Sequence, residues 1–427
     1  MFIGGYLKNS FIIFFLAFLF IIICVQEVTG QSKKIKFGGY GEILYRHFDY
    51  GPNQRASTSG SLPDSRAEVD IPRFALTLES YFTEDIYLEA EVEFEHLGTG
   101  SALELEYEEF GEYEFESEKG GKVLLEELHI TKIFLDEIKL RVGRFYVPVG
   151  LLSRAHLPTD YFTSVRPESE SQIIPAVWSE TGIEVFGKLF GSINYRAQVV
   201  NGLESTGFSS ERWIVEGHQD KFEFIKATNL AVALRLDYSG IDNFLFGVSG
   251  YYGNSSGNRP KPEDMQDFDG NVGIADFHAA YNSDDFIARG LILYGHLENS
   301  DIISQRNSSI SRNIQAPRTP VAEAALSYYI EAGYNVLKFF DDETSLKLFP
   351  FGRYEYYNSM EQVTGNVFAD PRFRRNLITF GINFFVLPNL VLKADYSMRG
   401  VGGFDSNYND ENTFGLSIGF YDWFVEF

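Results

Sequence analysis

Charged residues of both signs lie in one long stretch of the chain, residues 148–179, between two segments that alternate apolar and polar side chains. The stretch carries six groups that can attract or repel ions: Glu170 and the five that are predicted to line a constriction, Arg154, His156, Asp160, Arg166 and Glu168. In a narrow passage between low-dielectric walls, such groups would select solutes by charge and size. An exposed loop with solvated charges is the alternative. The choice depends on what the flanking elements build.

Four carboxylates share one face of segment 86–98, IYLEAEVEFEHLG. Successive side chains of a β-strand point to opposite faces, so apolar side chains cover the other face of this segment. The four are Glu89, Glu91, Glu93 and Glu95. A strand of a soluble sandwich also alternates in this way, with its polar face toward water. One strand therefore cannot distinguish a lumen wall from a solvated surface.

Segments with this two-residue period recur from residue 36 to the C-terminal end and predict sixteen strands. The predicted strands are 36–48, 70–82, 85–97, 123–135, 138–147, 180–190, 192–202, 228–240, 243–253, 271–283, 285–297, 321–335, 345–358, 376–387, 389–400 and 411–423. The connections alternate between short and long, and the long ones are rich in Gly, Ser, Asn, Asp and Pro. Transmembrane barrels sort their connections in this way, with short periplasmic turns and longer external loops.

Charges on the second face of the strands favour a closed barrel. Lys393 and Asp395 alternate with apolar residues, and a Lys or Arg facing lipid at mid-bilayer costs roughly 2–4 kcal/mol. Such groups must face a wet interior, and backbone groups in a bilayer need partners within the sheet, which must therefore close on itself. Sixteen strands leave an aqueous bore. The predicted fold is all-β, a 16-stranded antiparallel transmembrane β-barrel with short periplasmic turns and long external loops.

The predicted pore lining carries both signs of charge. Besides the carboxylates of segment 86–98, it comprises Lys139, Arg141, Arg235, Asp237, Lys393 and Asp395. If the two signs gather on opposite walls, they create a transverse field that orients polar solutes. Otherwise they only solvate the wall, and the sequence leaves both readings open.

The composition fits a membrane barrel. The 427 residues include 40 Phe and 25 Tyr, and only 22% of the residues are charged. After residue 30 there is no apolar run of about 18 residues, as a transmembrane helix would need. The net charge of −24 argues against nucleic-acid binding, because phosphate contacts need clustered Lys and Arg.

The sequence carries little that indicates catalysis or cofactor binding. The seven histidines form no metalloprotease-like cluster, and no phosphate-binding glycine pattern occurs. Residues 104–118 hold eight Glu, which could attract a divalent cation, but they lack the ligand spacing of a defined loop site. An acidic external loop is the favoured reading of this segment. We therefore expect no catalytic residues, no metal and no cofactor.

The first thirty residues predict a signal peptide. Lys8 precedes the apolar core FIIFFLAFLFIIIC at residues 11–24, and Gly30 offers a small residue at the cleavage position. A retained N-terminal anchor is the alternative. The only cysteine, Cys24, lies in this segment, so the exported barrel, residues 31–427, would hold no disulfide and no cysteine-ligated metal.

The C-terminal sequence YDWFVEF resembles the assembly signal of bacterial outer-membrane barrels, with Phe427 as the terminal residue. The apolar positions change parity just before this sequence, between Phe420 and Tyr421. Either a bulge shifts the register near Phe420, or an aromatic girdle places rings on both faces.

Three segments resemble the phosphate-selective porin O and P family. LRVGRFYVPVG at residues 140–150 is similar to the family's strand-to-loop signature, ETGIEVFGK at 180–188 to its next strand, and VVNG at 199–202 to the one after. The resemblance implies a 16-stranded, trimeric outer-membrane porin whose inward-folded third loop narrows the bore. In its phosphate-selective members basic side chains bind the solute, whereas here Arg141, Arg154 and Arg166 stand among many carboxylates.

The predicted function is an outer-membrane channel for small ions and hydrophilic solutes, with residues 148–179 as the candidate constriction loop and an anion- or phosphate-attracting patch there. The expected partners are outer-membrane lipid, the barrel-assembly machinery through Phe427 and further copies of the chain in a homotrimer, but not nucleic acid. A surface adhesin or receptor that acts through the external loops is the alternative.

Overall fold

The computed structural model describes residues 34–52, 63–96, 102–106, 114–118, 121–219, 224–258, 265, 267–310, 318–341, 344–403, 408 and 410–427. The predicted signal peptide, residues 1–30, lies outside the described residues, as does the middle of the acidic segment, 107–113. Among the described residues, no helix is long and apolar enough to cross a membrane.

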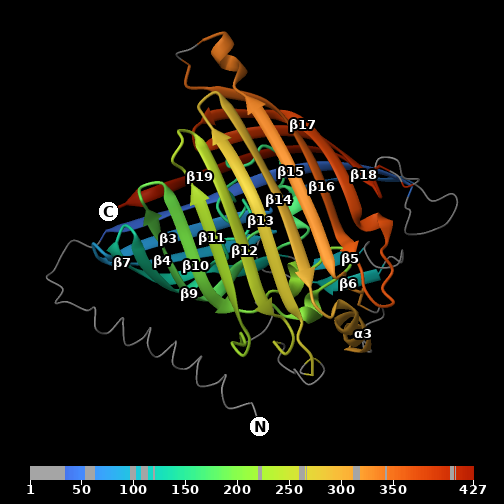
Figure 1. The fold of residues 1–427 in the computed structure, drawn as a ribbon. Helices are drawn as coiled ribbons and strands as arrows, with labels where there is room; N and C mark the ends of the chain where they lie inside the picture. Colours follow the sequence, from blue (N-terminus) through green and yellow to red (C-terminus); the bar gives the residue numbers. More distant parts are fainter. Residues whose placement is uncertain are drawn as a thin grey trace.

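Most of the described chain forms one antiparallel sheet that curves around an interior (Figure 1). Its strands are β1 (Ile35–Pro52), β2 (Pro63–Asp70), β3 (Arg73–Thr83), β4 (Ile86–Glu95), β7 (Lys122–Leu135), β8 (Ile138–Tyr146), β9 (Ser179–Leu189), β10 (Ile193–Asn201), β11 (Leu230–Tyr238), β12 (Phe244–Asn254), β13 (Asn271–Asn282), β14 (Phe286–Leu297), β15 (Ala324–Tyr334), β16 (Lys347–Gln362), β17 (Arg374–Leu387), β18 (Leu390–Val401) and β19 (Asn412–Glu426). A separate ribbon pairs β5 (Ala102–Glu106) with β6 (Glu114–Glu118).

The helical elements all lie in connections between strands. They are α2 (Glu168–Ser171), α3 (Ser300–Ile310) and the 3-10 turns η1 (Ser205–Gly207), η2 (Val215–Gly217), η5 (Val336–Phe339) and η6 (Pro371–Phe373). α3 lies at the lower end of the barrel as drawn in Figure 1.

The sheet closes because its first and last strands pair with each other. Gly41 of β1 lies opposite Phe420 of β19, and the backbone N–H of Phe427 donates to the carbonyl of Ile35 at 2.9 Å. Both ends of the barrel chain therefore lie at the same rim, as an even number of strands requires.

β2 and β3 together make one pass across the wall, since both pair with β1. Pro72 stands between them and has no N–H to donate to a ladder, which accounts for the break. When β2 and β3 are counted as one strand, the barrel has sixteen strands, which confirms the predicted number. The predicted strand 70–82 is β3, and β2 is an extension that the pattern did not indicate.

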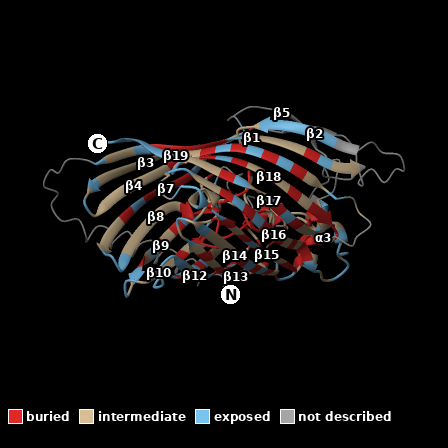
Figure 2. Cartoon of the chain, turned by 90° about the horizontal axis from the view of Figure 1, so that it is seen from above, coloured by how far each residue is buried: buried red, intermediate tan, exposed pale blue. Residues whose placement is uncertain are grey.

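The alternation of faces follows the predicted register. On β17, Phe380 and Ile382 point outward and are exposed, whereas Asn383 is buried. On β18, Asp395 is buried in the same way, and the outward Leu392 is exposed. Figure 2 shows the result as alternating buried and exposed bands along β1 and its neighbours. The outer face is apolar, so it suits lipid.

At the C-terminal end of β19 the structure shows both a bulge and aromatic rings on the two faces of the strand. Pairing with β1 continues without a shift through Trp423 opposite Gly38, and Phe424 is then bulged out before Val425 pairs with Phe37. The bulge therefore lies four residues later than the parity change. Tyr421 shares the face of its partner Tyr40, so aromatic rings occur on both faces near this rim.

Thiol labelling tests which face meets water. In a Cys24→Ala background, we expect a water-soluble maleimide to label Glu89→Cys, because the Glu89 side chain is 24% accessible on the inner face. Ile382→Cys should stay unlabelled in the membrane, because Ile382 is 47% exposed on the lipid-facing outer face, and it should react once the barrel is unfolded. Equal labelling of both variants in intact membranes would contradict the assignment of faces.

Candidate functional site

The connection between β8 and β9, residues 147–178, folds into the barrel and is anchored to several strands. Arg73 of β3, only 1% exposed, holds one side of it. Its Nε donates to Oε1 of Glu42 on β1 at 3.2 Å, and its Nη2 donates to the carbonyl of His156 at 3.0 Å and to the hydroxyl of Tyr161 at 3.2 Å. The Tyr161 hydroxyl in turn donates to Glu42 at 2.9 Å.

β18 anchors the middle of the connection. The ammonium of Lys393 donates to the carbonyls of Tyr161 and Thr163 at 2.8 and 3.0 Å, and it lies 3.9 Å from the centroid of the Tyr161 ring. Asp395 accepts the backbone N–H of Ser164 at 2.6 Å. Both side chains face inward and are covered by the connection rather than open to water.

Strands β16 and β18 bind the short helix α2 of the connection. Arg399 forms an ion pair with Glu168, and the hydroxyl of Tyr357 donates to the same carboxylate at 3.2 Å. The N–H and the hydroxyl of Ser169 both donate to Glu355 at 2.8 Å. Glu168 is thus an anchor of the connection, which the sequence could not indicate because Arg399 lies far along the chain.

The start of the connection rests on a buried polar network from β11, β12 and β13. Arg235 donates to both oxygens of Asp237 at 3.0 Å and to the carbonyl of Gly150. Asp276 accepts the backbone N–H of Gly150 at 3.0 Å, and His278 bridges Asp276 and Asp237 at 2.6 and 2.9 Å. Arg235 and Asp237 thus pair with each other and hold the connection from the inner face of β11.

Among the five charged groups predicted in this connection, the exposed one is Arg154. Its guanidinium donates to Asp237 at 3.0 Å while 53% of the side chain remains accessible. His156 packs against the rings of Tyr40 and Tyr146, with centroids 5.7 and 5.0 Å away. Asp160 accepts the N–H of Leu157 at 3.1 Å. Arg154 is therefore the group best placed to meet a solute.

Burial strongly shifts the pKa values of His156 and Glu170 in the connection. It lowers the pKa of His156 to about 3, and the nearby charges of Arg73 and Arg166 act in the same direction, so the imidazole is neutral at ordinary pH. Arg166 itself has one buried guanidinium nitrogen, Nη1, without a hydrogen bond partner. Burial raises the pKa of Glu170 to about 8, and the negative charge of Asp276 adds to the increase.

The carboxyl group of Glu170 lies against the turn at residues 150–152 and stabilises it. Its Oε1 accepts the N–H of Leu152 at 2.7 Å, whereas Oε2 has no hydrogen bond partner. Gly150 has a φ of +77° there, and a Cβ on it would lie 2.1 Å from Oε1 of Glu170. The glycine of the sequence VPVG is therefore required both by the backbone conformation and by the approach of the carboxyl group.

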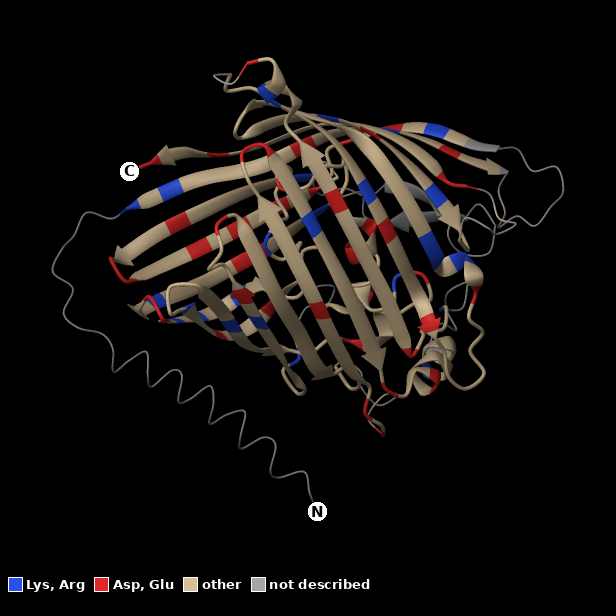
Figure 3. Ribbon diagram, turned by 45° about the horizontal axis from the view of Figure 1, so that its top comes forward, with Lys and Arg blue, Asp and Glu red and all other residues tan. Residues whose placement is uncertain are grey.

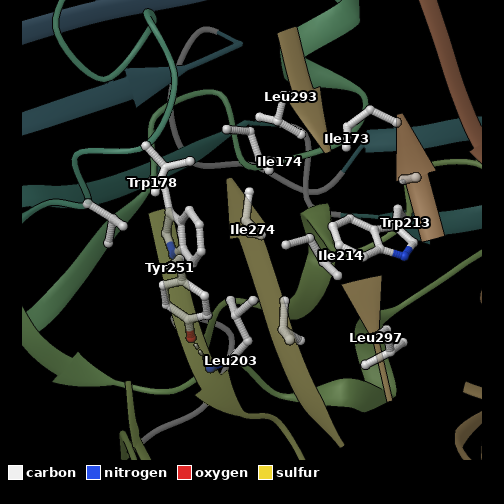
Figure 4. Close-up of a cluster of buried hydrophobic side chains, with 14 of the residues drawn as sticks. Ile173, Ile174, Trp178, Leu203, Trp213, Ile214, Tyr251, Ile274, Leu293 and Leu297 are labelled. Carbon is white, nitrogen blue, oxygen red and sulfur yellow. Dashed lines mark hydrogen bonds between the residues drawn. The ribbon is translucent and has the colours of Figure 1, made fainter. Parts of the chain in front are cut away.

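A second connection, residues 202–229, joins the first in an apolar cluster inside the barrel (Figure 4). Trp213 is fully buried, and its indole N–H donates to the carbonyl of Ala322 at 3.1 Å. It lies against Gly295 of β14, where a Cβ would be 2.1 Å from the ring. The cluster also contains inward-facing side chains of β12, β13 and β14 together with Ile173, Ile174, Trp178, Leu203 and Ile214. This sector of the interior is filled by side chains.

The acidic wall lies on β4 and β7. Glu91 and Glu93 face inward and are only 6% and 1% exposed. The hydroxyl of Tyr40 donates to both carboxylates, at 3.1 and 2.8 Å, and that of Tyr146 donates to Glu91 at 2.8 Å. Glu89 and Glu95 keep more contact with solvent.

Strand β7 adds acidic groups that the sequence did not single out. A bulge opposite Glu91 and Val92 turns both Glu126 and Glu127 inward, where both are buried. His129 lies on the same inner face, directly opposite Glu89. The alternation of segment 123–135 could have indicated Glu127 and His129, whereas the bulge that turns Glu126 inward has no signal in the sequence.

Basic groups adjoin the acidic wall on β8 and β10. Arg141 lies 3.3 Å from Glu184 of β9, and Arg196 donates to the same residue at 2.5 Å. Lys139 lies two residues before Arg141 on β8 and pairs with Phe186 of β9. Its side chain therefore faces inward as well. Figure 3 shows charges of both signs on strands around the wall.

Solvent reaches the inward-facing charges on one part of the wall much more than on the other. The accessible side chains lie on β3, β4, β8 and β10: Glu79 at 14%, Glu89 at 24%, Arg141 at 13% and Arg196 at 25%. The ion pairs of Arg353 on β16 with Glu331 and Glu355 are closed, since all three side chains are at most 2% accessible. A wet region therefore lies against β3, β4, β8 and β10.

The similarity of the chain to known proteins supports the fold. No protein-family model matches the sequence. An uncharacterized protein of Aquifex aeolicus (strain VF5) is 26% identical over 373 residues, which cover 87% of this chain and 77% of that protein.

Solved structures with a similar fold include an outer membrane channel and an anion-selective porin. The outer membrane channel DcaP of Acinetobacter baumannii has a TM-score of 0.53 at 10% identity and covers 93% of this chain. The anion-selective porin from Comamonas acidovorans has a TM-score of 0.52 at 10% identity, and OmpF of Salmonella typhi 0.52 at 13% identity, each covering 92% of this chain. All three are matched over 100% of their own length.

The closed sixteen-pass barrel, its apolar outer face and the fold that it shares with porins place the protein in the bacterial outer membrane. A shared fold does not identify the solute or how it is selected, because both depend on the side chains inside this barrel.

Proposed function

We propose that the protein is an outer-membrane porin, a water-filled channel through which small ions and hydrophilic solutes diffuse. The supporting observation is the accessibility of the inward charges on β3, β4, β8 and β10, because a barrel without an aqueous path has no reason to leave Glu89 and Arg196 open to solvent. In this proposal the 147–178 connection, which folds into the barrel, narrows the path and acts as the constriction loop.

Selection by charge would arise because the acidic wall and Arg154 offer charges of opposite sign to a passing solute. Glu89 and Glu95 attract cations along β4, whereas Arg154 offers an accessible guanidinium for an anion. The buried nitrogen of Arg166 adds positive potential nearby. We propose weak selectivity that favours cations overall, with an anion-attracting patch at the constriction that could hold phosphate, as the resemblance to phosphate-selective porins implies.

We also propose how the barrel is assembled in the membrane. The exposed terminal residue Phe427, at 82%, would present the signal for the barrel-assembly machinery, and the apolar outer face would contact lipid and two further subunits in a homotrimer. The expectation that the chain carries no catalytic residues and binds no cofactor remains a prediction.

Conductance in planar bilayers tests the proposal. We expect discrete conductance steps from the purified, folded chain, because a lumen lined by charged groups conducts ions. A folded barrel that inserts without producing steps would contradict the channel and favour the alternative role as a surface receptor.

Reversal potentials in a salt gradient test the assignment of charges. At about 0.1 M salt the Debye length is about 10 Å, so accessible charges beside the path should dominate. We expect Glu89→Gln to shift the reversal potential toward anion selectivity and Arg154→Ala to shift it toward cation selectivity. Glu93→Gln is the matched control: the same charge change at a covered position, 1% exposed, should produce a clearly smaller shift than Glu89→Gln. Equal shifts would mean that the path runs elsewhere.

A further inference from the structure

We propose that Glu89, Glu127 and His129 form a binding site for a divalent transition-metal cation of the Zn²⁺ type on the inner wall. Glu127 and His129 are two residues apart on β7 and so share a face, and Glu89 of β4 pairs directly with His129. One ligand atom of each residue lies within 4.8 Å of the other two. Carboxylate oxygen and imidazole nitrogen are common ligands of zinc.

The distances match the edges of a tetrahedral site. The Nε2 of His129 lies 3.5 Å from Oε2 of Glu89 and 3.8 Å from Oε1 of Glu127. A tetrahedral zinc ion with bonds of about 2.0–2.1 Å separates its ligand atoms by roughly 3.4 Å. Two carboxylates and a neutral imidazole balance the charge of a divalent ion. The three ligands leave a fourth position for water or a passing solute, as in open zinc sites.

His129 distinguishes this group from an ordinary acidic cluster. Its side chain is fully buried, yet Nε2 has no hydrogen bond partner, although buried polar atoms are normally paired. The Nδ1 atom lies 3.4 Å from the hydroxyl oxygen of Thr131. If the proton resides on Nδ1 and is donated to Thr131, the lone pair of Nε2 points toward the two carboxylates, which is the tautomer that binds metal.

Neighbouring residues hold the three ligand side chains in place and do not neutralise the negative charge of the two carboxylates. Gly143 of β8 has a φ of +137°, and a Cβ there would lie 2.7 Å from the Cα of His129, so only glycine lets β8 approach β7 at this point. The nearby cation, Arg141, is held by Glu184 at 3.3 Å and donates to Thr131 at 3.3 Å. Glu91, opposite Glu127, adds negative charge.

Metal titration of the folded full-length chain in detergent tests the site without reference to conductance. After treatment with a chelator and dialysis, Zn²⁺ is added and the bound metal is measured by equilibrium dialysis and calorimetry. We expect one high-affinity Zn²⁺ per chain. Glu127→Gln and His129→Gln should each weaken binding by at least tenfold, and Thr131→Val, which removes the partner of Nδ1, should weaken it by about 10- to 100-fold.

Two controls separate a built site from attraction to acidic groups. His96 pairs with Asp70 at 2.7 Å but is exposed, so His96→Gln should leave the affinity for Zn²⁺ unchanged. Ca²⁺ in equal amounts should not compete, because it prefers six to eight oxygen ligands. Variants are compared only when heat-modifiable migration shows a folded barrel, and Glu127→Gln serves if His129→Gln does not fold. Binding by the wild type that is no tighter than by these variants, or displacement by Ca²⁺, would overturn the proposal.

Discussion

Arg73→Met is expected to destabilise the barrel by about 3–5 kcal/mol, because it leaves the carboxylate of Glu42 buried without its positive partner. Both side chains are almost completely buried, at 1% and 6% side-chain exposure. The same change removes the donor to the carbonyl of His156 and to the hydroxyl of Tyr161, so the constriction loop should loosen as well. The midpoint of unfolding in urea and the single-channel conductance measure the two effects, and we expect the first to fall and the second to rise.

Two further variants show whether the effect comes from the buried charge. Arg73→Met combined with Glu42→Gln should recover much of the lost stability, because no unpaired charge remains inside. Arg306→Met removes a similar ion pair, to Asp267 at 2.7 Å, but at the surface, with 38% and 63% exposure. It should cost less than about 1 kcal/mol. If Arg73→Met cost no more than Arg306→Met, Arg73 would not be an anchor of the loop.

The wall of the barrel could be predicted because two independent patterns agree. Alternation places Ile382 outside and Asn383 inside, and the order of short and long connections gives antiparallel neighbours. Both patterns are local, so they can be read from a few consecutive residues. The break between β2 and β3 was missed because Pro72 interrupts the ladder while the chain continues in the same direction.

The interior was less predictable, because its contacts join residues that are far apart in the sequence. The sequence places Glu93 and Lys393 on the inner face, but nothing local shows that Tyr40 or Tyr161 covers them. The same holds for the ion pair of Glu168 with Arg399, which lies 231 residues further along the chain. The alternation rule therefore predicts which side a charge faces, and the folded loop decides whether water reaches it.

The apolar sector of the interior has a different explanation. On β13, inward Ile274 is apolar, although the rule for a wet lumen expects a polar residue there. Trp178 and Tyr251 pack in the same cluster with ring centroids 4.7 Å apart. Where two connections fold inward, the inner face of the wall becomes a packing surface, and alternation of polarity is lost. Sequence patterns fail there because inward side chains such as Ile274 are apolar like those of the outer face.

Glu170→Gln is expected to remove an alkaline sensitivity of the constriction loop. Burial raises the pKa of Glu170 to about 8 from an ordinary value near 4.5. The folded loop thus holds a proton that the unfolded chain releases, so the stabilisation is complete below about pH 4.5 and is lost as the pH rises toward 8. Between these two pH values the free energy of unfolding falls by about 1.4 kcal/mol per pH unit. In the wild type, the urea midpoint should fall and the conductance should fluctuate more between pH 5 and pH 9.

The glutamine variant keeps the shape of the carboxyl group and cannot ionise. Its side-chain oxygen can still accept the N–H of Leu152, which Glu170 now accepts at 2.7 Å, so both measurements should be nearly flat over the same pH range. Glu168→Gln is the contrasting variant: Arg399 holds the pKa of Glu168 below its usual range against the effect of burial, so its stabilisation is lost toward acid. That variant should be less stable at neutral pH but retain the alkaline sensitivity. A wild type and a Glu170→Gln variant with the same pH profile would show that Glu170 is not the group that titrates, because no other change in charge separates the two proteins.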